Sequence, residues 1–151
     1  MNHTDLALSH FQEGFSCAQA VLVAFAPDFG LDRDLALKIA AGFGGGMDRT
    51  GGTCGAASGA LMALGLKDGA TRGEDKTTKE RAYSRAREFL AQFQARHGAI
   101  TCPALLGHDI GTAAGMEAAR EQGLFKSLCP RLVEDAVKIV EEMWARDERV
   151  E

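Results

Sequence analysis

Four cysteines are the residues of this chain best suited to chemistry. They lie far apart in the sequence, at Cys17, Cys54, Cys102 and Cys129. No two of them form a C-x-x-C pair, which removes the usual spacing of zinc knuckles, ferredoxins and thioredoxin-like sites. The local context of each cysteine must therefore indicate its role.

Each cysteine lies where a helix is expected to begin. Cys102 and Cys129 are each followed by proline, which favours the first position of a helix. Cys54 follows two glycines and a threonine and precedes a run of small residues, and Cys17 opens an apolar segment. A helix N-terminus has unpaired N–H groups and a partial positive charge, and both stabilise a thiolate. We therefore expect thiols of lowered pKa, in the form that acts both as nucleophile and as metal ligand.

The glycines gather around one of these cysteines. The stretch GFGGGMDRTGGTCGAASGA, residues 42–60, holds eight of the 18 glycines of the chain and contains Cys54. Glycine reaches positive φ angles and lets backbone approach a ligand or another segment closely. The loop N–H groups are then expected to turn toward an anionic centre, as in a nest. The candidate binding residues are Gly45, Gly46, Gly51, Gly52 and Gly55.

The same glycines also allow close helix packing. Gly55 and Gly59 are four residues apart on one helix face, and the alanines nearby extend this small-residue surface. A second helix can approach such a face closely and bring its own cysteine to Cys54. We expect Cys54 to lie within disulfide or shared-metal range of at least one other cysteine, and most of the four to line one pocket walled by helix N-termini. The alternative is a tight loop and a close helix crossing that bind no ligand.

The glycine-rich loop does not match G-x-x-x-x-G-K-[ST], and no strand precedes it, so a phosphate-binding loop is disfavoured.

The elements that position the cysteines are predicted to be helices. Apolar residues recur at helical spacing, and neither a period-two strand nor a repeat is found. We expect a single all-α domain over residues 1–151, a compact bundle of about five to seven helices. The predicted helices cover residues 4–13, 16–26, 34–43, 54–65, 77–96 and 129 onward, with a helical turn at 100–107 and a weak helix or ordered loop at 111–125.

Composition narrows the class of protein. The chain is 46% hydrophobic and 25% charged, as in globular proteins, and is long enough to fold without a disulfide or metal. Its net charge of −4 disfavours nucleic-acid binding. The N-terminus lacks the pattern of a secretory signal, and no apolar run reaches the roughly 20 residues of a membrane span. We therefore expect no membrane insertion and a cytoplasmic location, where cysteines stay reduced unless catalytic or metal-bound.

At the cysteines the chain resembles a known family. The stretches FSCAQAVL, GGTCGAASGA, ITCPALLGHD and LCPRLVEDAV resemble the redox-active proteins whose signature is four dispersed cysteines, one in a C-G-A-x-x-G motif. The resemblance covers nearly the whole chain, and it marks all four cysteines as functional. It also implies a redox partner or a membrane transporter system as partner, since family members often occur in gene neighbourhoods with transporters.

Three functions remain open from the sequence. The first is a thiol redox protein, enzyme or carrier, in which Cys54 attacks a disulfide, sulfane sulfur or other oxidant and Cys102 or Cys129 resolves the intermediate. Cys17, in the most apolar segment, is expected to be the least accessible. The second is a binding protein whose four thiolates hold zinc or an iron–sulfur cluster, with His108 as a supporting residue. The third is a helical scaffold that docks a partner without sulfur chemistry.

Overall fold

The computed structural model describes residues 1–150, which are predominantly helical. The α-helices and two 3₁₀ turns follow one another as α1 (His3–Gln12), α2 (Cys17–Phe25), η1 (Ala26–Phe29), α3 (Arg33–Ala40), η2 (Ala41–Phe43), α4 (Gly44–Met47), α5 (Gly55–Asp68), α6 (Lys76–His97), α7 (Cys102–Leu106), α8 (Ala113–Glu121), α9 (Leu124–Ser127) and α10 (Cys129–Val150).

The all-α prediction is confirmed, but the expected number of helices is too low. Eight of the α-helices in residues 1–150 have five residues or more, against the five to seven expected. The excess comes from short segments with weak local signals. Residues 111–125, expected to be a weak helix or an ordered loop, form α8 and then α9. The Thr112 hydroxyl, which accepts from the Gly115 N–H, caps the start of α8.

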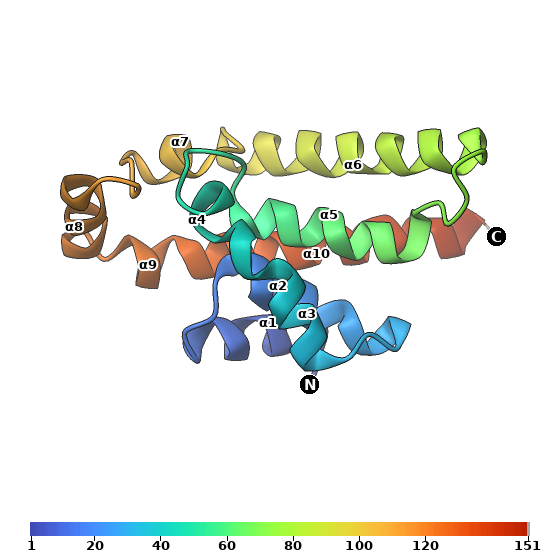
Figure 1. The fold of residues 1–151 in the computed structure, drawn as a ribbon, viewed down its shortest axis with the longest axis horizontal. Coiled ribbons are helices and arrows are strands. Elements are labelled where there is room, and N and C mark those ends of the chain that lie inside the picture. Colours follow the sequence, from blue (N-terminus) through green and yellow to red (C-terminus); the bar gives the residue numbers. More distant parts are fainter. Residues whose placement is uncertain (151) are drawn as a thin grey trace.

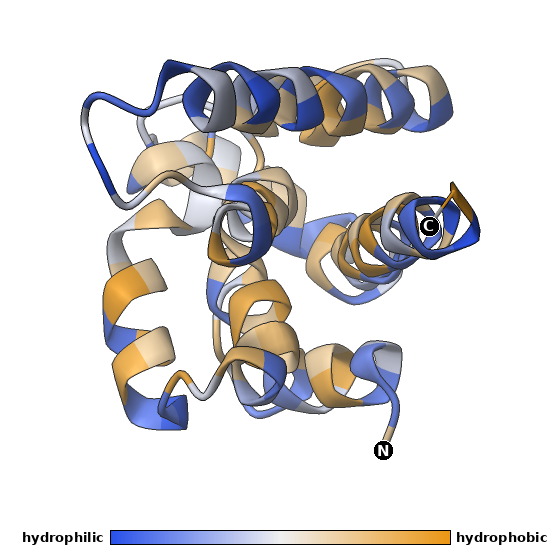
Figure 2. Ribbon diagram, turned by 90° about the vertical axis from the view of Figure 1, so that its right-hand side faces the viewer, coloured by the Kyte–Doolittle hydropathy of each residue, from blue (hydrophilic) through white to orange (hydrophobic). Residues whose placement is uncertain are grey.

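The helices pack as layers around a shared core. Figure 1 shows α6 along one side of α5 and α10, with α1, α2 and α3 on the other side. The largest fully buried side chains include Phe25 from α2 and Phe89 and Phe93 from α6. In Figure 2, α6 turns a largely hydrophilic surface outward and its hydrophobic residues inward. This arrangement leaves α7, α8 and α9 together at the end of the bundle away from the C-terminus (Figure 1).

The closest crossing in the core joins α2 and α5. A Cβ atom added to Gly59 would lie 2.7 Å from the Ala18 carbonyl oxygen and 3.0 Å from the Val21 Cβ. One added to Gly55 would lie 3.0 Å from the Ala18 nitrogen. Any larger side chain would push the two backbones apart, so these glycines fix how near α2 comes to α5. The prediction of a close crossing at this small-residue face is confirmed.

Within residues 1–150, no helix combines the length and the apolar character that crossing a membrane requires.

Candidate functional site

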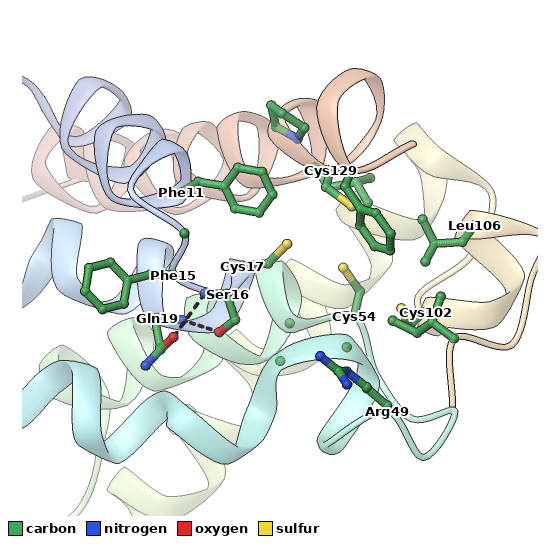
Figure 3. Close-up of a pocket in the computed structure, with 18 of the residues that line it drawn as sticks. Phe11, Phe15, Ser16, Cys17, Gln19, Arg49, Cys54, Cys102, Leu106 and Cys129 are labelled. Carbon is green, nitrogen blue, oxygen red and sulfur yellow. Dashed lines mark hydrogen bonds between the residues drawn. The ribbon is translucent and has the colours of Figure 1, made fainter. Parts of the chain in front are cut away.

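All four cysteines line one cavity. Its volume is about 920 Å³, and the residues around it come from α1, α2, α5, α7, α8, α9, α10 and the glycine-rich loop. Figure 3 shows the sulfurs of Cys17, Cys54 and Cys129 turned toward a common space, with Cys102 beside Cys54. The expectation that most of the four cysteines line one pocket is confirmed.

The cysteines also lie at helix starts, as predicted. Cys17, Cys102 and Cys129 are the first residues of α2, α7 and α10, and Cys54 is the N-cap of α5. Helix N-termini therefore surround the cavity with N–H groups and partial positive charge.

Cys17 is positioned by a reciprocal cap. The Ser16 hydroxyl accepts a hydrogen bond from the Gln19 N–H, and the Gln19 side chain accepts one from the Ser16 N–H. The Gln19 amide also donates to the Leu37 carbonyl, which ties the start of α2 to α3. Such capping boxes fix the beginning of a helix, and here they fix the backbone that carries Cys17 (Figure 3).

Cys54 and Cys102 are held together by backbone pairing. Thr53 and Thr101 form an isolated antiparallel bridge. The Cys54 N–H donates to the Ile100 carbonyl at 2.7 Å, and the Cys102 N–H donates to the Gly52 carbonyl at 3.0 Å. Side chains alternate between the two faces of paired strands. Cys54 and Cys102, each one residue beyond a bridge threonine, therefore project from the same face.

The glycine-rich loop packs closely against α7 at this wall. A Cβ on Gly46 would lie 2.8 Å from the Cys102 Cβ, so glycine there lets α7 approach. The Gly52 N–H donates to the Gly46 carbonyl and is therefore not free for a ligand. Of the five glycines proposed as binding residues, Gly45 and Gly55 line the cavity, whereas Gly46, Gly51 and Gly52 are not among the described residues that line it.

The pKa of Cys54 moves in the direction opposite to the one expected. Burial raises its pKa to about 11, although the backbone N–H groups of Ala56 and Ala57 act to lower it. The helix start is present, but removal from water outweighs it. Burial also raises the pKa of Cys102 to about 12, with further contributions from the negative charges of Cys54, Cys129 and Asp109. Both thiols are therefore protonated at neutral pH.

The pKa values of Cys17 and Cys129 are shifted in opposite directions from the ordinary cysteine value. A hydrogen bond with Cys17 lowers the pKa of Cys129, even though burial acts against it. The same hydrogen bond is the main cause that raises the pKa of Cys17, followed by burial and the charges of the other cysteines. Of these two thiols Cys129 is therefore the one that ionises first, with Cys17 as the hydrogen-bond donor to its thiolate.

The accessibility of the cysteines also differs from expectation. Cys17 is the one cysteine that is partly exposed, while Cys54, Cys102 and Cys129 are buried. The apolar interior of α2 begins one residue later, at Ala18, and Cys17 lies at the helix end beside the cavity. Its sulfur still points inward (Figure 3), which is why burial contributes to its raised pKa.

The metal site of four thiolates, the second function left open by the sequence, is not found assembled among residues 1–150. In the part of the chain that the structure describes, no group of three or more His, Cys, Asp and Glu side chains is arranged to hold a metal ion. Among residues 1–150, His108 is not one of those that line the cavity.

The cavity contains charged and aromatic residues that sequence reasoning missed. Three cations line it, Arg49 from the glycine-rich loop, Arg120 from α8 and Lys126 from α9. The aromatic side chains of Phe11, Phe15 and Phe125 do so as well. Arg49 lies inside the glycine stretch and had a local signal, but nothing in the sequence around Arg120 or Lys126 distinguishes them from surface residues.

The sequence model of one family matches most of the chain. The family is described as "Putative redox-active protein (C_GCAxxG_C_C)", and the match covers residues 15–143, which include all four cysteines. The chain belongs to this family. The printed signature has Gly before Cys, whereas this chain has Cys54 before Gly55, with Ala56 and Gly59 in the remaining fixed positions. No curated protein and no solved structure matches the chain.

Proposed function

We propose that this member of a redox-active family is a thiol–disulfide exchange protein in which Cys129 attacks a disulfide and Cys17 resolves the intermediate. The observation that carries the proposal is that Cys17 and Cys129 turn their sulfurs into the same cavity (Figure 3), where the interaction between them lowers the pKa of Cys129 and raises that of Cys17. The pairing replaces Cys54, the attacker expected from sequence. A thiolate held beside a second thiol is the arrangement that such exchange requires.

The reaction balances with a disulfide as the oxidant. The Cys129 thiolate attacks one sulfur of the substrate R–S–S–R′, forms a mixed disulfide with R–S, and releases R′–S⁻. The Cys17 thiol gives its proton to that leaving thiolate or to solvent. The resulting Cys17 thiolate attacks the Cys129 sulfur and releases R–S⁻. The protein then holds a Cys17–Cys129 disulfide, and two electrons have passed to the substrate.

Cys54 and Cys102 have a different part in this proposal. Their pKa values, raised to about 11 and about 12, keep them protonated and therefore slow as attackers at neutral pH. They remain near the reacting pair as neutral thiols. A dithiol small enough to enter the cavity then returns the two electrons to Cys17 and Cys129, in a reducing compartment such as the cytoplasm.

Trapping the intermediate tests the proposal. The protein is reduced without oxygen and treated with bis(2-hydroxyethyl) disulfide, and the products are mapped by mass spectrometry of peptides. The wild type is expected to lose two of its four thiols as a Cys17–Cys129 disulfide. Cys17→Ser is expected to stop at a mixed disulfide on Cys129, while Cys129→Ser loses the fast reaction.

The remaining cysteines supply the matched controls. Cys54→Ser and Cys102→Ser are expected to keep the two-thiol loss and the Cys17–Cys129 product. A mixed disulfide that accumulates on Cys54 in the Cys102→Ser or Cys129→Ser variant would instead restore the assignment made from sequence. Metal analysis and a visible spectrum of the same oxygen-free sample test the four-thiolate alternative.

A further inference from the structure

The cavity has the size of a site for a small molecule. Its volume of about 920 Å³ lies within the roughly 300–1,000 Å³ typical of ligand pockets. Three of its four cysteines are buried, with exposed fractions of 3% for Cys54, 8% for Cys102 and 7% for Cys129. A disulfide on the surface of a folded protein would not reach sulfurs this deep without opening the bundle. A small disulfide can enter the cavity.

The charged residues of the cavity favour one sign of ligand. Arg49, Arg120 and Lys126 are exposed, and within residues 1–150 none of them forms an ion pair. Asp48 is the one carboxylate among the lining residues that the structure describes. The three cations come from three separate segments, and they leave a net positive charge at the cavity. Charge of one sign in a cleft raises the local concentration of ligands of the opposite sign.

The placement of Arg49 is costly for the backbone. Met47, Asp48 and Arg49 have φ angles of 61°, 56° and 63°, in the left-handed region that residues other than glycine rarely adopt. Each such residue costs on the order of 1 kcal/mol or more. The strained turn directs Arg49 along the wall of the cavity beneath Cys54 (Figure 3).

The rest of the wall suits an apolar body. Phe11, Phe15 and Phe125 line the cavity, together with the aliphatic Leu106 and Ile110. The lining therefore combines apolar surface, cations and thiols. A ligand that matches all three has a short hydrocarbon part, a negative charge and a sulfur–sulfur bond.

We infer that the substrate of this pocket is a small organic disulfide bearing carboxylate or similar anionic groups, bound by Arg49, Arg120 and Lys126. The inference rests on the proposed exchange at Cys129 and specifies its substrate class. The disulfide is the oxidant, its anionic groups remain unchanged, and its two halves leave as thiolates. The cations hold the charged ends while the sulfur–sulfur bond lies among the cysteines.

Three short disulfides of different charge test the inference. They are 3,3′-dithiodipropionate, a dianion, bis(2-hydroxyethyl) disulfide, which is neutral, and cystamine, a dication. The rate at which each oxidises the reduced protein is divided by its rate with dithiothreitol at the same pH, which removes their intrinsic reactivity. The normalised rate is expected to be at least about tenfold higher for the dianion than for the neutral compound, and lowest for cystamine. Added salt should reduce the advantage.

Variants that remove positive charges test whether the cavity cations cause the preference for the anionic disulfide. In Arg49→Gln/Arg120→Gln/Lys126→Gln the three normalised rates should converge. The matched control is Lys38→Gln/Lys76→Gln/Arg87→Gln, which removes the same charge from exposed residues outside the cavity and should keep the preference for the dianion. If both triple variants lose the preference equally, the effect comes from net charge and the site is overturned.

A ligand that cannot react separates binding from exchange. Octanedioate has the length and charges of 3,3′-dithiodipropionate with carbon in place of sulfur, and calorimetry measures its binding. Binding to the wild type and not to the cavity triple variant supports the inference. Absence of octanedioate binding, together with equal rates for the three disulfides, overturns the substrate class but leaves the exchange reaction standing. If none of the disulfides oxidises Cys17 and Cys129, the proposed function fails, and the inference with it.

Discussion

Thr53 pairs with Thr101 in an isolated antiparallel bridge, and the residue after each threonine is a cysteine of the cavity. The hydrogen bonds flank the threonines and do not join them, so Thr53 and Thr101 are a non-hydrogen-bonded pair. The Cα atoms of such pairs lie about 4.5 Å apart. The bridge links the backbone just before α5 to the backbone just before α7, next to Cys54 and Cys102.

The bridge can be tested by cross-linking it. In a Cys54→Ser/Cys102→Ser background, Thr53→Cys/Thr101→Cys is expected to form an intramolecular disulfide, because about 4.5 Å is within the Cα range of such bonds. Non-reducing peptide mapping detects it. The control pair Thr50→Cys/Thr101→Cys should not cross-link, because Thr50 is not paired with Thr101 in the bridge. Efficient cross-linking of this control pair would mean that the loop is too mobile to hold the register.

The ionisation of Cys129 is expected to depend on a donor at position 17. Cys17→Ala removes the hydrogen bond that lowers the Cys129 pKa, so that pKa should rise. A hydrogen bond to a charged group is stronger than one between neutral groups, so its loss should be visible in the titration of Cys129. The rate of alkylation against pH, in the Cys54→Ser/Cys102→Ser background, gives the midpoint. Cys17→Ser keeps a hydroxyl donor and should show a smaller rise. An unchanged midpoint in both variants would remove Cys17 as the cause.

The contact between α2 and α5 should tolerate no side chain at Gly59. Gly59→Ala places a Cβ 2.7 Å from the Ala18 carbonyl oxygen, and the overpacking is expected to lower the free energy of unfolding by about 1–3 kcal/mol. Gly65→Ala is the control on the same helix, because a Cβ there meets nothing within 4 Å. It should raise stability by about 0.5–1 kcal/mol through helix propensity. Urea unfolding measures both, and equal effects in the two variants would contradict close packing at Gly59.

The free energy of unfolding at alkaline pH should depend on the buried Cys54 thiol. Its folded pKa is about 11, whereas an unfolded cysteine ionises near about 8.5, so above that pH the unfolded chain holds fewer protons than the folded one. The free energy of unfolding must therefore fall as pH rises through this window. In Cys54→Ala the fall should be shallower by up to about 1.4 kcal/mol per pH unit. Urea unfolding of reduced protein gives the slopes.

A buried residue that does not titrate provides the control for this slope. Leu106→Ala removes apolar volume from the same cavity wall and should lower stability equally at every pH. If Cys54→Ala has the wild-type slope, the Cys54 thiol does not resist ionisation in the folded protein.

Local signals explain what the sequence predicted correctly. Proline after Cys102 and after Cys129 marks a helix start whatever the tertiary structure, and both helices begin at these cysteines. Gly55 and Gly59 likewise indicate a close contact through their spacing alone, and α2 occupies it. The all-α class follows from apolar periodicity, which is also local.

Tertiary burial explains what the sequence did not predict. The helix start at Cys54 is a local feature, but the desolvation that raises its pKa arises from segments packed over it. The same holds for the cavity cations Arg120 and Lys126, because only the fold brings α8 and α9 to the cysteines. The expected lowering of the Cys54 pKa rested on the helix start alone, without the burial that opposes it.

Cys17 and Cys129 lie near opposite ends of the sequence, at the starts of α2 and α10. A disulfide between them would close most of the chain into one loop, and the loss of chain entropy in the unfolded state is worth about 4.7 kcal/mol for a loop of about 100 residues. The oxidised protein would then unfold far less often than the reduced one. The oxidised protein would therefore resist proteolysis longer than the reduced protein. The redox state of Cys17 and Cys129 would then also determine how long the protein survives.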